Sequence, residues 1–253
     1  MTIQVYDGCN IIYRALNDTS LHAARGMNIR QRYNSLQASD IWVFDGFDHN
    51  ARRRAIYPPY KMKRPPTPMN ITAQMKMFKA LIALSPATLI ELEGWEADDV
   101  IGTLARKGAP MRIHTTDMDY AQLAHLPNVT LNGVKTKDIP ARWVPLYKAT
   151  VGDSSDDIVG IPSFGPGAWA NLHAHLENFE RAVIAGRPGV FEAFGLTPKV
   201  TDWLSVEENI KLVQNMLLIT HFFPVPEDEL NAGITPGRPD PATANALLTK
   251  YLL

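Results

Sequence analysis

Short apolar runs alternate with longer amphipathic stretches through the first part of the chain. The short runs predict buried strands at residues 3–6, 41–44, 88–90, 111–115 and 129–131. Helices are predicted at residues 10–16 and 71–84, and again over much of the chain from about residue 177, ahead of a proline-rich stretch at 224–241. Strands that alternate with helices indicate an α/β fold with a central, mainly parallel sheet flanked by helices.

A further helix is predicted after the third strand, and it begins among three acids. Its apolar stripe has the spacing i, i+3, i+4, i+7, i+8 and consists of Ala97, Val100, Ile101, Leu104 and Ala105. The first turn carries Glu96, Asp98 and Asp99, where the helix dipole mildly stabilises carboxylates. Crowded like charges also repel, and a hard divalent cation relieves that repulsion. The segment is therefore either a capped helix start or part of a metal site.

Other acids stand where predicted strands end. Asp7 and Asp45 each begin an Asp-Gly pair, and Asp117 and Asp119 follow the fourth strand. Asp-Gly pairs are common in turns, but functional groups of parallel sheets also collect at these strand ends. Two residues apart, Asp117 and Asp119 point the same way if the stretch is extended. His114 lies within its strand, and we interpret it as a core residue rather than a ligand.

The stretch from residue 151 to 167 combines acids with glycines. Asp153 and Asp156 share one face if their segment is helical. Glycines at 160, 165 and 167 then interrupt the helical pattern, which resumes near Ala168. This arrangement predicts a helix–hairpin–helix element, whose backbone amides can bind a phosphate group.

Basic residues are concentrated in one segment although the net charge is only −1. No acid occurs from His49 to Asn70, and five prolines fall within eleven residues, which excludes a continuous helix there. The basic residues are Arg52, Arg53, Arg54, Lys61, Lys63 and Arg64. The segment is either a solvated linker or, because tyrosines are interleaved with the cations, a nucleic-acid contact.

The composition is typical of a globular protein with a hydrophobic core. It has 253 residues, of which 45% are hydrophobic and 20% charged. The single cysteine, Cys9, excludes an internal disulfide framework, fits a reducing compartment and is interpreted as a buried hydrophobe. No leader or membrane-spanning run is visible, so we expect a cytoplasmic protein. We expect one structural unit with an α/β core at residues 1–150, including the basic segment at about 49–70, and a helical region at 151–253.

Taken in order, these motifs resemble those of the structure-specific 5′-nucleases. This family comprises the flap endonucleases, bacteriophage 5′-exonucleases and the 5′-nuclease domain of bacterial DNA polymerase I. The resemblance runs from about residue 3 to residue 175. It rests on Asp7-Gly8 with Tyr13-Arg14, Phe44-Asp45, the basic segment from Arg53 to Pro68, Trp95 to Asp99, Thr116-Asp117-x-Asp119, and Gly152-Asp153-x-Ser155-Asp156 with the glycines.

The resemblance implies a PIN-like 5′-nuclease fold with an arch or loop, and two ions of Mg²⁺ or Mn²⁺. The tighter site corresponds to Asp7, Asp45, Glu96, Asp98 and Asp99, and the second to Asp117, Asp119, Asp153 and Asp156. Lys61 and Arg64 join Asp98 and Asp99 as the expected catalytic residues. Paired divalent ions supply what phosphodiester hydrolysis needs, and zinc is disfavoured because no Cys/His cluster is present.

The same resemblance implies contacts with DNA. In the family a 5′ single strand passes the arch, and the hairpin holds duplex DNA, often with a K⁺ ion. The corresponding residues are Arg14, Arg53, Tyr57, Tyr60, Lys61, Arg64, Gly160, Ile161, Ser163, Gly165 and Gly167. Tyr57 or Tyr60 either stacks on a base or packs the arch. DNA with a 5′ flap, nick or free 5′ end is the expected partner, and an RNA–DNA hybrid is a second one.

Three positions depart from the family pattern. Asp157 stands in place of the usual asparagine, Ser163 in place of the middle glycine, and Gly167 in place of a frequent lysine. The sequence therefore does not decide whether the hairpin binds duplex DNA and K⁺ as in the family. The arch is short and broken by prolines, so we expect it to be mobile without DNA.

The resulting hypothesis is a metal-dependent 5′→3′ exonuclease and flap endonuclease of DNA replication or repair, from a bacteriophage or bacterium. No polymerase domain follows Leu253, so we expect a free-standing, monomeric enzyme. A non-catalytic DNA-junction-binding protein is the main alternative, and it predicts loss of acids. A toxin-type ribonuclease lacks the arch and hairpin, and a structural calcium-binding protein leaves the basic segment unexplained.

Overall fold

The computed structural model describes residues 2–17, 25–134 and 139–251, and the chain divides into two compact units. The first, here called the sheet unit, comprises residues 1–49, 65–135 and 223–253. The second, the helical unit, comprises residues 50–64 and 136–222. This grouping differs from the division predicted at residue 150. Most of the basic segment belongs to the helical unit, and the end of the chain belongs to the sheet unit.

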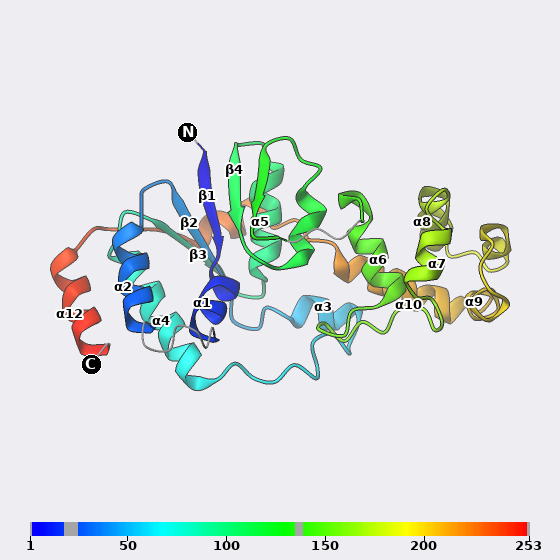
Figure 1. Ribbon diagram of the computed structural model, residues 1–253, viewed down its shortest axis with the longest axis horizontal. Coiled ribbons are helices and arrows are strands. Elements are labelled where there is room, and N and C mark those ends of the chain that lie inside the picture. Colours follow the sequence, from blue (N-terminus) through cyan, green and yellow to red (C-terminus); the bar gives the residue numbers. More distant parts are fainter. Residues whose placement is uncertain (1, 18–24, 135–138, 252–253) are drawn as a thin grey trace. The chain divides into compact units, whose positions relative to one another are not determined.

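The sheet unit is built on six strands, of which β1 to β4 are labelled in Figure 1. They are β1 (Ile3–Asp7), β2 (Asp40–Asp45), β3 (Thr88–Leu92), β4 (Met111–His114), β5 (Val129–Asn132) and β6 (Ile234–Pro236). Their order is β5-β4-β1-β2-β3-β6, and every neighbouring pair is parallel except β3 with β6. The predicted mainly parallel α/β sheet is thereby confirmed. The sequence pattern missed β6, because it is three residues long and ends in a proline.

Helices flank this sheet. They are α1 (Gly8–Asn17), α2 (Arg25–Ser35), α4 (Met69–Ala83), α5 (Ala97–Arg106), α11 (Glu227–Ala232), α12 (Pro241–Tyr251) and the 3-10 helix η2 (Met118–Leu123). The core includes Phe78 and Leu81 of α4, both fully buried against Trp42 and Phe44 of β2. His114 stacks on Tyr6 with ring centroids 4.4 Å apart, and its Nε2 lies 2.9 Å from Gln4 Oε1. It is only partly buried at the end of β4, whereas the sequence indicated a core residue.

The helical unit contains α3 (Ala51–Ile56), α6 (Val144–Val151), α7 (Pro166–Asn171), α8 (Leu176–Ala185), α9 (Pro198–Leu204), α10 (Glu207–Thr220) and the 3-10 helices η3 (Ala141–Trp143) and η4 (Val190–Phe194). Leu146 of α6, Phe179 of α8 and Val213 of α10 are fully buried in its core. None of the described helices, in either unit, is long and apolar enough to cross a membrane.

Candidate metal centre and basic segment

Asp7 lies at the carboxyl end of β1, where the strand runs directly into α1. Its Oδ1 accepts a hydrogen bond from the backbone amide of Asn10 at 3.1 Å, and its Oδ2 accepts one from the Thr115 hydroxyl at 3.0 Å. The pKa of Asp7 is raised to about 7, chiefly by burial and then by the charge of Asp45. The charge of Asp117 also raises it, and the two hydrogen bonds lower it. The carboxyl therefore lies in a negative environment, and a bound cation would favour its ionised form.

The acids at the start of α5 converge as the sequence predicted. Glu96 is the N-cap residue, and Asp98 and Asp99 fall in the first turn. Each of the three offers a carboxylate oxygen within 4.8 Å of the other two. Asp45, at the end of β2, accepts the Ala97 amide on its Oδ1 at 2.8 Å, which places a fourth carboxylate at the same helix end.

Tyr120 of η2 lies in the negative environment of several of these acids within the sheet unit. The ring is fully buried, and burial raises the pKa of its hydroxyl well above the usual value. The charges of Asp7, Asp98, Asp117 and Asp45 raise that pKa further, because a phenolate would stand among carboxylates. An all-oxygen set of this kind fits a hard divalent cation such as Mg²⁺ or Mn²⁺.

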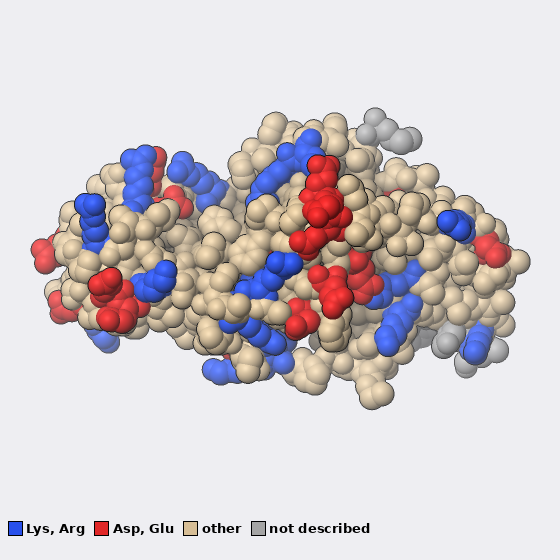
Figure 2. Space-filling model, turned by 180° about the vertical axis from the view of Figure 1, so that it is seen from behind, with Lys and Arg blue, Asp and Glu red and all other residues tan. Residues whose placement is uncertain are grey.

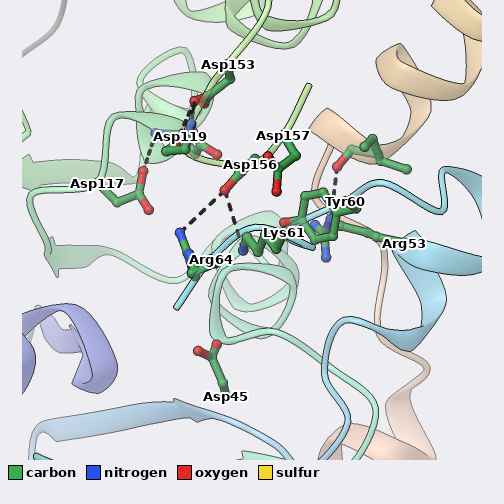
Figure 3. A network of polar contacts seen from close by, with 12 residues as sticks. Asp45, Arg53, Tyr60, Lys61, Arg64, Asp117, Asp119, Asp153, Asp156 and Asp157 are labelled. Carbon is green, nitrogen blue, oxygen red and sulfur yellow. Dashed lines mark hydrogen bonds and ion pairs between the residues drawn. The ribbon is translucent and has the colours of Figure 1, made fainter. Parts of the chain in front are cut away.

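Asp117 and Asp119 differ from the predicted extended geometry. Asp117 is the N-cap of η2, and its Oδ1 accepts the Asp119 amide at 2.9 Å (Figure 3). The stretch is a helix start rather than a strand extension, so the two-residue alternation does not apply. Thr115 fixes this end of the cluster, because its Oγ1 donates to Asp7 and accepts the Asp117 amide at 3.1 Å. The sequence pattern did not identify Thr115 as a site residue.

The Asp99 carboxylate also has a structural contact. Its Oδ1 accepts the Phe223 amide at 2.7 Å, and Thr103 Oγ1, one turn further along α5, accepts the Val225 amide at 2.9 Å. Residues 223 and 225 thus contact α5, and the Phe223 amide orients one of the clustered acids.

In the helical unit, Asp153 and Asp156 lie in a tight turn and not on a helix. The turn is closed by Asp153 and Ile158, whose backbone groups exchange hydrogen bonds of 2.8 and 2.9 Å. Gly152 precedes it with φ +94°, and a Cβ there would lie 2.9 Å from the Ile158 carbonyl oxygen, so only glycine fits. Both acids face Lys148 of α6, with Nζ to Oδ2 distances of 2.6 Å for Asp153 and 3.8 Å for Asp156.

The basic segment contacts this turn through backbone and side-chain groups. The Lys61 amide donates to the Asp156 carbonyl at 3.1 Å, and the Lys63 amide donates to Asp157 Oδ2 at 2.8 Å. Lys61 Nζ and Arg64 Nη2 lie 3.9 and 3.5 Å from Asp156 Oδ1 (Figure 3). The turn therefore contacts Lys61, Lys63 and Arg64 of the segment.

Three of the residues that the resemblance assigned to DNA contact are buried in the helical unit. Tyr57 and Tyr60 are 3% and 2% exposed and belong to the core of the helical unit, so neither ring is available to stack on a base. Arg53 is 2% exposed, and its guanidinium donates to the carbonyls of Ile219 at 2.9 Å and His221 at 3.3 Å. Their spacing among cations gave no indication of burial. By contrast, Arg14 and Arg64 are exposed.

The glycine hairpin lies between α6 and α7. Gly160 and Ser163 have φ values of +68° and +65°, so Ser163 adopts a conformation that suits the glycine usual at this position. Ile161 is buried, and its amide donates to the Thr150 carbonyl at 2.8 Å. Gly165 and Gly167 border open space, where a Cβ would meet nothing within 4 Å.

Charge on the surface is mixed in sign. Lys and Arg side chains and Asp and Glu side chains both occur on the face shown in Figure 2. This agrees with the small net charge of −1. Any polyanion contact therefore depends on local groups of cations rather than on a field of one sign.

Comparison with known proteins identifies the class to which this fold and acidic cluster belong. Residues 2–144 match the family described as the 5′-3′ exonuclease, N-terminal resolvase-like domain, and the chain belongs to this family. The resemblance that the motifs indicated is confirmed.

Individual relatives agree with this assignment. The chain is 32% identical over 213 residues to a thermostable DNA polymerase I of Thermus filiformis, covering 71% of this chain and 25% of the relative. It is 28% identical over 217 residues to a 5′-3′ exonuclease of Aquifex aeolicus, covering 71% and 75%. It thus spans about a quarter of the polymerase relative. A structure of T5 5′-exonuclease with bound divalent metal ions (zinc) has the same fold, with a TM-score of 0.60, 17% identity and coverage of 98% and 99%.

Proposed function

We propose that the chain is a divalent-metal-dependent 5′→3′ exonuclease and flap endonuclease. It hydrolyses phosphodiester bonds near the 5′ end of branched, nicked or single-strand-tailed DNA, and RNA–DNA hybrids are a further substrate. The observation that carries the proposal is the buried carboxylate cluster at the start of α5, in a chain that belongs to the 5′-3′ exonuclease family. A DNA-junction-binding protein without activity has no use for these mutually repelling acids.

The sheet-unit acids would hold the metal, and Mg²⁺ or Mn²⁺ suits their oxygen atoms. Such an ion, when bound, supplies an activated water and neutralises charge on the phosphate. The protein supplies orientation. The Thr115 hydroxyl and Asn10 amide fix Asp7, and the Ala97 amide fixes Asp45. Because these donors are in place before any ion binds, the carboxylates need little rearrangement to receive one.

Cations outside the cluster would bind the DNA backbone. Arg64 has a 53% exposed side chain on the basic segment, and Lys61 is beside it at 10%. Arg14 of α1 is an exposed cation of the sheet unit. Phosphate contacts of such residues position the strand without reading its sequence, which suits an enzyme that recognises DNA ends. The open backbone at Gly165 and Gly167 would contact the duplex in the same sequence-independent way.

The direct test uses a 5′-labelled flap and a nicked duplex, each with Mg²⁺ and with EDTA. Metal-dependent release of short 5′ products is the expected result. The Asp98→Ala variant should lose cleavage and keep DNA affinity, whereas Asp202→Ala, which removes an exposed acid of α9, should cut like the wild type. Tight binding without cleavage under Mg²⁺ or Mn²⁺ would instead establish the junction-binding alternative.

A further inference from the structure

Lys148 contacts two of the four acids to which the family resemblance assigned a second divalent ion. Its ammonium is 2.6 Å from Asp153 Oδ2 and 3.8 Å from Asp156 Oδ2, and the side chain is only 12% exposed. The residue is held on α6, whose end is fixed by the Gly152 amide donating to the Lys148 carbonyl at 3.0 Å. The lysine therefore reaches both acids from a regular helix and not from a loose surface position.

The remaining oxygens of this acidic pair also face donors. Asp153 Oδ1 accepts the Ser155 amide at 2.8 Å and the Ser155 hydroxyl at 2.6 Å. Asp156 Oδ1 lies 3.5 Å from the Arg64 guanidinium and 3.9 Å from the Lys61 ammonium. All four carboxylate oxygens thus face a hydrogen-bond donor or a cation.

The charge of this group is also balanced without a metal. Two carboxylates face three cations, and Asp157, the third acid of the turn, accepts the Lys63 amide. Although burial alone would raise the pKa of Asp153, the Lys148 charge and the donors of Lys148 and Ser155 hold it below the usual value. A divalent ion placed here would meet the ammonium of Lys148 at close range and be repelled. The pair as arranged does not fit a second metal site.

We propose that Lys148 is the built-in cation of the Asp153–Asp156 pair, and that a divalent ion binds there only when the lysine is displaced. This inference rests on the proposed function only in that the family resemblance included the pair among four acids assigned to a second metal ion. Its consequence is specific: the protein holds the ion of the sheet-unit cluster tightly, and any ion at the Asp153–Asp156 pair weakly.

The test measures Mn²⁺ binding to metal-free protein, by calorimetry and by the electron paramagnetic resonance signal of free Mn²⁺. Lys148→Met removes the ammonium and keeps the length of the side chain. This variant should bind one ion more than the wild type in the same concentration range, with affinity at the pair raised about tenfold or more. Adding Asp153→Asn to Lys148→Met should abolish the gain. The control is Lys107→Met, which breaks an exposed pair with Glu227 at 3.1 Å and should leave Mn²⁺ binding unchanged.

A second variant covers the case in which Lys148→Met does not fold, as judged by circular dichroism. Asp153→Asn alone keeps the lysine and should bind the same number of tight Mn²⁺ ions as the wild type. Loss of a tight ion in Asp153→Asn, or unchanged Mn²⁺ binding in a folded Lys148→Met protein, would overturn the inference. Both measurements report Mn²⁺ binding and do not require cleavage. A protein that fails to cleave DNA would therefore contradict the proposed nuclease function but would not decide the role of Lys148.

Discussion

Replacing Asp7 with asparagine removes one charge from the buried cluster and keeps the shape of the side chain. The asparagine oxygen can still accept the Asn10 amide, and its NH₂ group can donate to the Thr115 hydroxyl, which now accepts instead of donating. Packing and hydrogen bonding are therefore nearly preserved. The variant isolates the cost of holding an ionised carboxylate beside Asp45 and Asp117.

The pKa of Asp7 gives the size and sign of that cost. Burial raises it from 3.8 to about 7 in the folded protein, while an unfolded chain has the usual value. Between about pH 4 and pH 7 the folded state thus binds more protons than the unfolded state, and the free energy of unfolding falls as pH rises. A difference of roughly three pH units corresponds to about 4 kcal/mol at pH 8, which Asp7→Asn should recover in large part.

The assay is urea denaturation of both proteins in EDTA at a series of pH values from 4 to 8. The variant should be more stable at pH 8, and its advantage should shrink towards zero near pH 4. Mn²⁺ should reverse the order at pH 8, because an ion that binds only the folded wild type stabilises it by mass action. The control variant Asp202→Asn changes an exposed acid, and its free energy of unfolding relative to the wild type should not show this pH dependence. Equal unfolding free energies of wild type and Asp7→Asn at pH 8 in EDTA would refute the reasoning.

Three further predictions concern the helical unit. Arg53→Met should lower the free energy of unfolding by about 3 kcal/mol, because the Ile219 and His221 carbonyls lose a buried charged donor. If urea denaturation is unchanged and DNA binding is weakened, Arg53 contacts DNA instead. Ser163→Gly should raise the free energy of unfolding by about 1 kcal/mol, because Ser163 has a φ of +65°, which costs a residue with a Cβ more than glycine. A lower melting temperature of the variant would contradict this. Lys61→Ala should slow cleavage at saturating flap substrate about 100-fold with little change in the dissociation constant, and equal losses in both would make Lys61 a binding contact only.

Local sequence carried much of the fold and of the acidic cluster. Burial can be predicted from the apolar runs of β1 to β5 and from the apolar stripe of α5. The position of each residue in the strand or helix period decides which side it faces. Acids that follow parallel strands meet at one edge of the sheet, so strand order alone groups Asp7 and Asp45 with the α5 acids. Periodicity could not predict β6, whose three residues gain their partner from distant β3.

Residue types alone did not decide what the cations and aromatic rings do. Arg53, Tyr57 and Tyr60 have the composition of a DNA contact, yet packing in the helical unit buries all three. Thr115 and Lys148 carry no signal in the sequence pattern, because their roles depend on partners brought close by folding. Thus the sequence by itself determined the five parallel strands of the sheet, the helix that carries the clustered acids and the family. Only the tertiary structure decided which charges are neutralised internally, because charge compensation depends on distances between side chains that local periodicity does not specify.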